Sequence, residues 1–409
     1  MNVAQIEGTL TPDILQQALN LVQKRHPMLQ VHIVDLPDGT YFQSVGTLKI
    51  PLRFIDKQHE YQWLNIAESE LHQKFSALCE PLCRVTFLRS STSNGISEII
   101  ATFHHAITDG MSCMCFIHDL LSYCQQIADG EHISEVATME LLPPLENLLA
   151  SSLTHQNKVE ETPEKTHKEI PIPKLIIEGE VPPSQRRTRL VTRILSPEMT
   201  LKLKERYKQE KTTIHGALCA AMLLGTAKIA FTDTPHSLSC GSSVNVRKFC
   251  EPEVNDEYIG DFALVVTEHH TLDQTTNFWD LARECKSKIS YSISRGFPIQ
   301  DKLRNLDKDL IIKISEEQNG RNEALHISNL GQTKFLNEYG IFKMKSLYFV
   351  PGVHLMGACL WLGVVTFHEQ VFCSFAHVVP VVSAKTAELL ADSVIATIQK
   401  ACVSESLTF

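Results

Sequence analysis

The chain has 409 residues, of which 43% are hydrophobic and 21% charged. This balance is that of ordinary globular proteins, and the length corresponds to roughly two or three domains. A formal net charge of -9 argues against a nucleic-acid-binding protein. The first residues, MNVAQIEGTL, lack a basic stretch followed by an apolar one, so we expect no secretory signal and a cytoplasmic protein.

Neither a membrane span nor a metal site is expected. The most apolar stretch, residues 349–367, is interrupted by proline, histidine and glycine, which favours strands and turns over a membrane helix. The 12 cysteines follow no metal-ligand spacing, so the sequence predicts reduced, mostly buried thiols.

The first part of the chain reads as strand, helix and strand. The helix has Thr11 as its N-cap and Pro12 at its first position. Hydrophobic periodicity then predicts a strand, a helix and two strands, at residues 29–33, 63–78, 82–88 and 96–103. The last strand runs directly into His104 and His105, and a further helix is predicted after Gly110.

Residues 143–183 combine many prolines with charged and polar residues, which predicts a linker or a surface crossover. After it, an alternating strand precedes a helix that Ser196 caps and a second, fully buried helix. The later strands are predicted at residues 237–246, 262–267, 324–328, 346–350, 359–367 and 370–375, before a final helix at 384–400. We therefore expect an N-terminal lobe over residues 1–150, a linker over 151–185 and a C-terminal lobe over 186–409.

The two halves share a weak internal similarity. In each, a strand is followed by a histidine, a short loop and a helix: IATFHHAITDG in the first half and CSFAHVVPVVS in the second. The second copy contains His377 but lacks the Asp-Gly pair. This pattern predicts a pseudo-dimer with one working site.

The segment from His104 to Gly110 is the main candidate for chemistry. A strand delivers the histidines, Asp109-Gly110 predicts a tight turn, and the following helix N-terminus favours a carboxylate nearby. Histidine can remove a proton near neutral pH, and a rigid loop suits a general base. A structural histidine pair and a metal site remain alternatives, although adjacent strand residues point to opposite faces and cannot easily share one ion. The chain has no GxSxG, Walker A or GxGxxG motif.

HHAITDG resembles the HHxxxDG signature of a superfamily of acyltransferases. Its members include chloramphenicol acetyltransferase, peptide-synthetase condensation domains, plant acyl-CoA-dependent acyltransferases and polyketide-associated acyltransferases. The resemblance extends along most of the chain, through LQQALNLVQKRHPML, PLCRVTFL, TTIHGALC, SVNVR and ISNLG. The plant DFGWG motif is missing; Gly260-Asp261-Phe262-Ala263 comes nearest and is not counted as that motif.

The resemblance implies an α/β fold: a two-lobed, chloramphenicol acetyltransferase-like pseudo-dimer in which each lobe is a mixed β-sheet covered by helices, with a tunnel between the lobes. It implies that His105 is the catalytic base and that Ser328 stabilises the oxyanion. The other motif residues support the site. These are His104, Asp109 and Gly110, with Arg247 as the ion-pair partner of Asp109.

The expected reaction moves an acyl group from a thioester to a hydroxyl, directly and in a ternary complex, as in polyketide, lipid or other secondary metabolism. The co-substrate would be acyl-CoA or the phosphopantetheine of an acyl carrier protein acting in trans, with no further cofactor. Amide formation by a free-standing condensation domain, carrier recruitment without catalysis and a metal-dependent hydrolase are the alternatives. We expect a monomer. An acidic carrier would need a basic surface, for which the candidates are Arg186, Arg187, Arg189 and Arg193.

Overall fold

The computed structural model describes residues 1–75, 79–92, 95–149, 177–231, 235–296, 323–354 and 358–403. The chain forms two compact units, each built from three segments. The first unit comprises Met1–Leu148, Asn245–Ala263 and Gln332–Val350, and the second Leu149–Val244, Leu264–Gly331 and Pro351–Phe409. Two segments that the sequence places in the C-terminal lobe thus belong to the first unit. Most of the linker expected at 151–185 lies outside the described residues.

The first unit contains a six-stranded mixed sheet with the order β11-β12-β1-β6-β5-β4. Its strands are β1 (Asn2–Glu7), β4 (Leu52–Asp56), β5 (Cys83–Arg89), β6 (Ile96–Phe103), β11 (Glu338–Tyr339) and β12 (Phe342–Phe349). β1 pairs antiparallel with both β6 and β12, whereas β4 is parallel to β5. The late strand β12 therefore completes the sheet beside the first strand of the chain. A separate hairpin joins β2 (His32–Leu36) to β3 (Gly39–Gln43).

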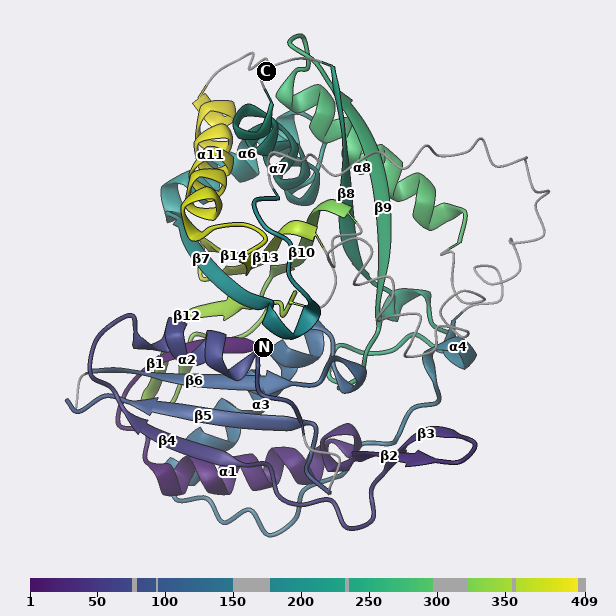
Figure 1. Cartoon of the computed structure of the whole chain (residues 1–409). Helices are drawn as coiled ribbons and strands as arrows, with labels where there is room; N and C mark the ends of the chain where they lie inside the picture. Colours follow the sequence, from purple (N-terminus) through teal and green to yellow (C-terminus); the bar gives the residue numbers. More distant parts are fainter. Residues whose placement is uncertain are drawn as a thin grey trace. The chain divides into compact units, whose positions relative to one another are not determined.

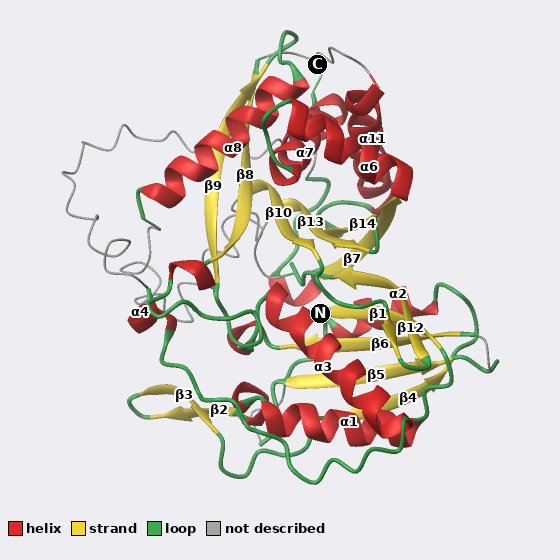
Figure 2. Ribbon diagram, turned by 180° about the vertical axis from the view of Figure 1, so that it is seen from behind, coloured by secondary structure: helices red, strands yellow, loops and turns green. Residues whose placement is uncertain are grey.

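The helices of the first unit are α1 (Pro12–Arg25), α2 (Gln62–Glu70), α3 (Gly110–Ala128) and the short α4 (Leu145–Leu148). Thr11 caps α1 as predicted, by accepting a hydrogen bond from Ile14 N. α1 packs against α3, and both lie over one face of the sheet (Figure 2). The strand predicted at residues 29–33 is wrong in its first part. Pro27–Gln30 forms a 3-10 turn, because Pro27 fixes φ near the helical value at its first position.

The second unit contains another six-stranded mixed sheet, with the order β7-β14-β13-β10-β8-β9. Its strands are β7 (Arg187–Leu195), β8 (His236–Asn245), β9 (Ala263–Leu272), β10 (Glu323–Gln332), β13 (Ala358–Phe367) and β14 (Gln370–Val379). β14 is antiparallel to its neighbours β7 and β13, and β8 is parallel to β10. The predicted fold class, two lobes of mixed sheet and helices, is confirmed.

The helices of the second unit are α6 (Pro197–Gln209), α7 (Ile214–Ala230), α8 (Phe278–Ser294) and α11 (Ala384–Val403). α7 packs against α8 and α11 (Figure 1), and every one of its residues from Gly216 to Ala227 is buried. Within the described ranges, no single helix is long and apolar enough to cross a membrane. Taken together, α6 and α7 are long and apolar enough, but the two helices are bent by 102° relative to each other. All twelve cysteines are free thiols, and most are buried.

Candidate active site at the histidine loop

The loop after β6 begins with His104, which shapes the backbone. Its Nδ1 accepts a hydrogen bond from Ala106 N at 3.2 Å and so caps the 3-10 turn from His105 to Ile107. An accepting Nδ1 must be unprotonated, so the neutral ring carries its proton on Nε2. Burial lowers the pKa of His104, and the neighbouring His105 lowers it further. His104 therefore serves the loop as a neutral structural group.

His105 is placed differently, because 78% of its side chain is exposed. Its Nδ1 lies 3.2 Å from Asp261 Oδ2. An ionised carboxylate can only accept, so Nδ1 carries the proton and Nε2 is left as the basic nitrogen. The hydrogen bond to Asp261 raises the pKa of His105 above its ordinary value. This is the arrangement that a histidine general base requires.

Asp109 is buried at the start of α3 and accepts four hydrogen bonds. As the N-cap, it accepts from Ser112 N at 2.8 Å through Oδ1. Arg247 donates from Nη1 to Oδ2 at 2.6 Å and from Nη2 to Oδ1 at 3.2 Å. Phe262 N donates to Oδ2 at 3.0 Å. The ion pair that the sequence analysis expects is thus present, and the helix cap is present beside it.

Arg247 is almost fully buried, with 1% of its side chain exposed. Besides Asp109, its Nη2 donates to Ser112 Oγ at 2.8 Å and to Tyr258 O at 3.1 Å. The guanidinium also lies over the ring of Phe262, 4.5 Å from the centroid. Arg247 belongs to the segment Asn245–Ala263 of the first unit. The pair therefore fixes this late segment to α3.

Gly110 differs from its predicted role. It is the first residue of α3, and its φ is not positive, so no left-handed turn occurs there. The turn consists instead of the 3-10 residues His105 to Ile107 followed by the extended cap residue Asp109. The hydrogen bonds of His104 and Asp109 hold this change of direction, and the conformation of Gly110 is not left-handed.

The contact between Asp261 and His105 is not predicted from the sequence. The two residues are 156 positions apart, and Gly260-Asp261-Phe262-Ala263 attracted notice only as an incomplete plant motif. A local signal did exist: Asp261 is the only charged residue between Tyr258 and Thr267, directly before strand β9. A single carboxylate in an apolar run needs an explanation, because burying an unpaired charge is costly.

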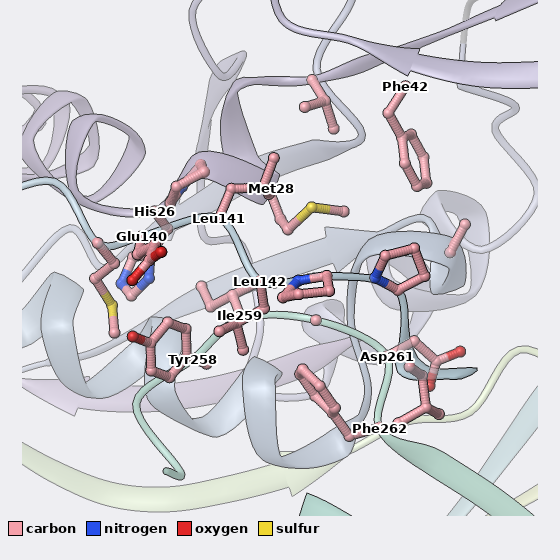
Figure 3. Close-up of a pocket in the computed structure, with 18 of the residues that line it drawn as sticks. His26, Met28, Phe42, Glu140, Leu141, Leu142, Tyr258, Ile259, Asp261 and Phe262 are labelled. Carbon is pink, nitrogen blue, oxygen red and sulfur yellow. The ribbon is translucent and has the colours of Figure 1, made fainter. Parts of the chain in front are cut away.

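A pocket of about 560 Å³ opens beside this loop, with Ala106 and Asp261 in its wall (Figure 3). Most of the lining is apolar: Pro27, Met28, Val31, Phe42, Ala106, Met139, Leu141, Leu142, Pro143, Pro144, Leu145, Ile259 and Phe262. Figure 3 shows Asp261 and Phe42 toward one end, with His26, Glu140 and Tyr258 toward the other. The volume lies in the usual range of small-molecule sites, roughly 300–1,000 Å³. His105 is not among the lining residues; the pocket adjoins the histidine loop through Ala106 and Asp261 and can hold an apolar group there.

Among the residues that the structure describes, His26, Cys115 and Asp119 form the only group whose ligand atoms are close enough for one metal ion. Asp119 Oδ2 is already bound by His26 Nε2 at 2.7 Å and by Arg25 Nε at 3.1 Å. Burial also raises the pKa of the Cys115 thiol, which disfavours the thiolate that a metal needs. The fixed positive charge of Arg25 beside the shared carboxylate opposes cation binding. We interpret this group as a structural ion-pair cluster.

The remaining predicted residues lie in the second unit. Ser328 is a buried residue of β10, and its role in stabilising an oxyanion stays a prediction. His377, the counterpart of the motif histidine, is only 1% exposed and lies 3.0 Å through Nδ1 from Val382 O. The proposed basic surface is not continuous. Arg186 is buried, and Arg193 forms ion pairs with Glu388 and Asp392 of α11.

Two mixed-sheet units, with an exposed histidine between a strand and a capped helix in one of them, agree with the fold that the HHxxxDG resemblance implies. The family model described as "Condensation domain" matches residues 2–289. The chain belongs to this family.

Solved structures agree with this fold over nearly the whole chain. The epimerization domain from the third module of tyrocidine synthetase B is superimposed with a TM-score of 0.70 at 15% identity, covering 98% of this chain and 90% of that one. Polyketide synthase associated protein 5 from Mycobacterium tuberculosis gives 0.68 at 13% identity, covering 98% and 94%. At such identities the likeness establishes the fold.

Sequence relatives are very large proteins. Nonribosomal peptide synthase roqA of Penicillium rubens is 32% identical over 111 residues, covering 27% of this chain and 4% of the relative. Nonribosomal peptide synthetase sirP of Leptosphaeria maculans is 23% identical over 174 residues, covering 41% and 8%. The chain thus matches only a small part of the length of these relatives.

Proposed function

We propose that this chain is an acyltransferase in which His105 is the general base. It would move an acyl group from a thioester, acyl-CoA or an acyl carrier protein supplied in trans, to a hydroxyl acceptor. The observation that carries the proposal is the state of His105. Its Nδ1 is occupied by Asp261, its Nε2 is the basic nitrogen, and its ring is exposed, while its neighbour Ala106 and its partner Asp261 lie in the wall of an apolar pocket.

The chemistry follows from that state. Nε2 of His105 takes the proton of the acceptor hydroxyl as its oxygen attacks the thioester carbonyl. The tetrahedral intermediate then collapses, the C–S bond breaks, and the departing thiolate takes the proton back from His105. Ser328 is the proposed donor to the oxyanion. A positioned base contributes roughly 100- to 10,000-fold to such a step. No enzyme nucleophile is required, because a thioester is already activated.

The pocket supports a substrate with an apolar group. Met28, Phe42 and Ile259 would contact an acyl chain or the apolar body of an acceptor, with its reacting end toward Ala106 and the histidine loop. The relatives are peptide synthetases, so we propose that the donor or acceptor comes from secondary metabolism. No carrier-binding surface is assigned to Arg186, Arg187, Arg189 and Arg193, because Arg186 is buried and Arg193 is already ion-paired.

An amine acceptor, giving an amide, is the second candidate. The pocket lining includes the carboxylates of Glu140, Glu146 and Asp261 and contains neither lysine nor arginine. Such a lining attracts an ammonium group and disfavours an anionic acceptor. His105 would perform the same proton transfer on the amine nitrogen after it has lost its first proton.

One experiment tests both candidates. The protein is incubated with a panel of acyl thioesters and with alcohols and amines of matched carbon skeleton, and products are identified by mass spectrometry. His105→Ala should lower turnover at least about 100-fold. His132→Ala, which removes an exposed histidine outside the site, is the control. If His105→Ala keeps more than about a tenth of the wild-type rate, His105 is not the base. If the protein binds an acyl carrier protein but forms neither ester nor amide, the result would favour carrier recruitment without catalysis.

A further inference from the structure

We propose that Asp261 is a positioning residue for His105: it fixes the orientation and tautomer of the ring so that Nε2 faces the substrate as a base. This inference rests on the proposed function. It assigns a role to a residue outside the histidine motif, in a segment more than a hundred positions away along the chain.

The carboxylate of Asp261 is oriented at both oxygens. Oδ2 accepts from His105 Nδ1 at 3.2 Å, and Oδ1 accepts from Ala263 N at 3.2 Å. The bond to its own strand limits rotation of the carboxylate, so the oxygen that faces His105 stays in place. A base that is held in this way loses little conformational freedom when the substrate binds.

The backbone on both sides of Asp261 is fixed to the start of α3. On one side, Gly260 O accepts from Asp109 N at 3.1 Å and from Ser112 Oγ at 2.7 Å, and Gly260 N donates back to Ser112 Oγ at 3.0 Å. On the other side, Phe262 N donates to Asp109 Oδ2 at 3.0 Å. Asp261 is thus the one residue of the three whose side chain is directed to His105 while its neighbours are clamped.

This clamp gives the motif aspartate an indirect effect on the base. The side chain of Asp109 accepts hydrogen bonds from Ser112, Arg247 and Phe262, and its amide donates to Gly260; none of these bonds involves His105. The chain of contacts runs from Asp109 to the backbone beside Asp261 and from Asp261 to the imidazole. The hydrogen bonds at the start of α3 therefore fix the position of the Asp261 carboxylate beside the imidazole of His105.

The electrostatic consequence has a definite sign. The hydrogen bond and the charge of Asp261 raise the pKa of His105; desolvation of the ring and, less strongly, the ammonium of Met1 lower it, and the net shift is upward. His104, the other titratable ring of the loop, is kept neutral by burial, which lowers its pKa. A base works unprotonated, so the acidic limb of activity should lie above the ordinary histidine value of about 6.5. Removing the charge of Asp261 should move that limb to lower pH.

The test compares Asp261→Asn with Asp261→Glu and with Asp256→Asn. Asp256 is an exposed carboxylate of the same segment whose nearest cation is Lys334 at 3.5 Å, so its variant controls for the loss of one negative charge. The first readout needs no substrate. In protein labelled with ¹⁵N-histidine, the Nδ1 and Nε2 shifts of His105 are followed through a pH titration, with His105→Gln used for assignment.

We expect Asp261→Asn to lower the pKa of His105 and to increase the tautomer protonated at Nε2, because an amide can donate to Nδ1. Asp256→Asn should leave both unchanged, and Asp261→Glu should restore part of the wild-type behaviour. An unchanged pKa and tautomer in Asp261→Asn would overturn the proposal. This readout is independent of whether the acyltransferase assignment is correct.

The second readout is kinetic. Asp261→Asn should lower kcat at least about 10-fold, part of the roughly 100-fold or more that a positioned base supplies, with little change in KM. Its acidic limb should shift to lower pH. A rise in KM at constant kcat would overturn the positioning role and would assign Asp261 to substrate binding. Absence of transfer in the wild type with every donor would refute the proposed function, while the NMR titration would still decide the pairing.

Discussion

Replacing Asp109 tests whether the buried ion pair or only the helix cap holds the histidine loop. Asp109→Ala removes the bond from Ser112 N, both bonds from Arg247 and the bond from Phe262 N. Loss of an N-cap alone costs about 1 kcal/mol. Leaving a buried charge without its partner costs about 3 to 5 kcal/mol. Arg247 keeps Ser112 Oγ and Tyr258 O as acceptors, so we expect a total near the lower end of that range, about 3 kcal/mol.

Two further variants separate the contributions. Asp109→Asn keeps an oxygen that can cap α3 but removes the charge that Arg247 needs, so it should still lose most of this stability. Ser196→Ala removes the exposed cap of α6, whose Oγ accepts from Met199 N at 3.2 Å, and should cost only about 1 kcal/mol.

Peptide-level hydrogen exchange across a urea series is the assay, because it reports α3 and α11, and hence each unit, separately. The expected result is a large loss of protection in α3 for both Asp109 variants. If Asp109→Asn is as stable as the wild type and Asp109→Ala loses no more than Ser196→Ala, the ion pair contributes nothing. The argument that it secures the loop would then be refuted.

Four further outcomes are expected. After incubation with the donor alone, intact-protein mass spectrometry should show no acyl adduct; a stable adduct that disappears when acceptor is added would contradict direct transfer. A chelator should leave activity unchanged, since Asp119 is already bound by Arg25 and His26, and inhibition would restore the metal-site hypothesis. Met28→Trp should fill part of the pocket and raise KM for long apolar substrates more than for short ones; an equal effect on both would argue against this pocket. Limited proteolysis should cut first within residues 143–183, and early cleavage within α7 would contradict the buried assignment of that helix.

Local signals in the sequence were sufficient for the elements with strong caps and periodicity. The face of α1 formed by Leu15, Ala18, Leu19 and Val22 is buried as its spacing predicts. The strand that ends at the histidines is also where the apolar run places it. The helix α8 was missed, although Asn277 caps it and Phe278, Leu281, Ala282 and Cys285 repeat at helical spacing. Polar residues between these apolar positions made the helical periodicity of α8 difficult to recognise in the sequence.

Long-range relations were not encoded in local patterns. Nothing in the alternation of β12 indicates that Tyr348 pairs with Val3, so the sequence analysis assigned this strand to the wrong half. Arg247 was anticipated because a buried aspartate needs a cation and because related proteins place one there. Asp261 had no such precedent, and its contact with His105 depends on how segment 245–263 returns to α3. Site residues could therefore be predicted where they belong to a motif, as His105 does, or where a buried charge needs a partner, as Asp109 does.

The interleaved segments of the first unit have a consequence for biosynthesis. When residue 148 has been made, β1 has β6 on one side, but its other edge remains unpaired until Phe342–Phe349 emerges from the ribosome. At about 5–20 residues per second, this interval lasts on the order of ten to forty seconds. During that time β1, a central strand of the finished sheet, has one unpaired edge, and unpaired strand edges favour aggregation. Asp109 also lacks its counter-ion until Arg247 is synthesised. The ion pair that holds the histidine loop can therefore form only late in translation. Fragments that end near residue 148 should show little of the proposed acyl transfer.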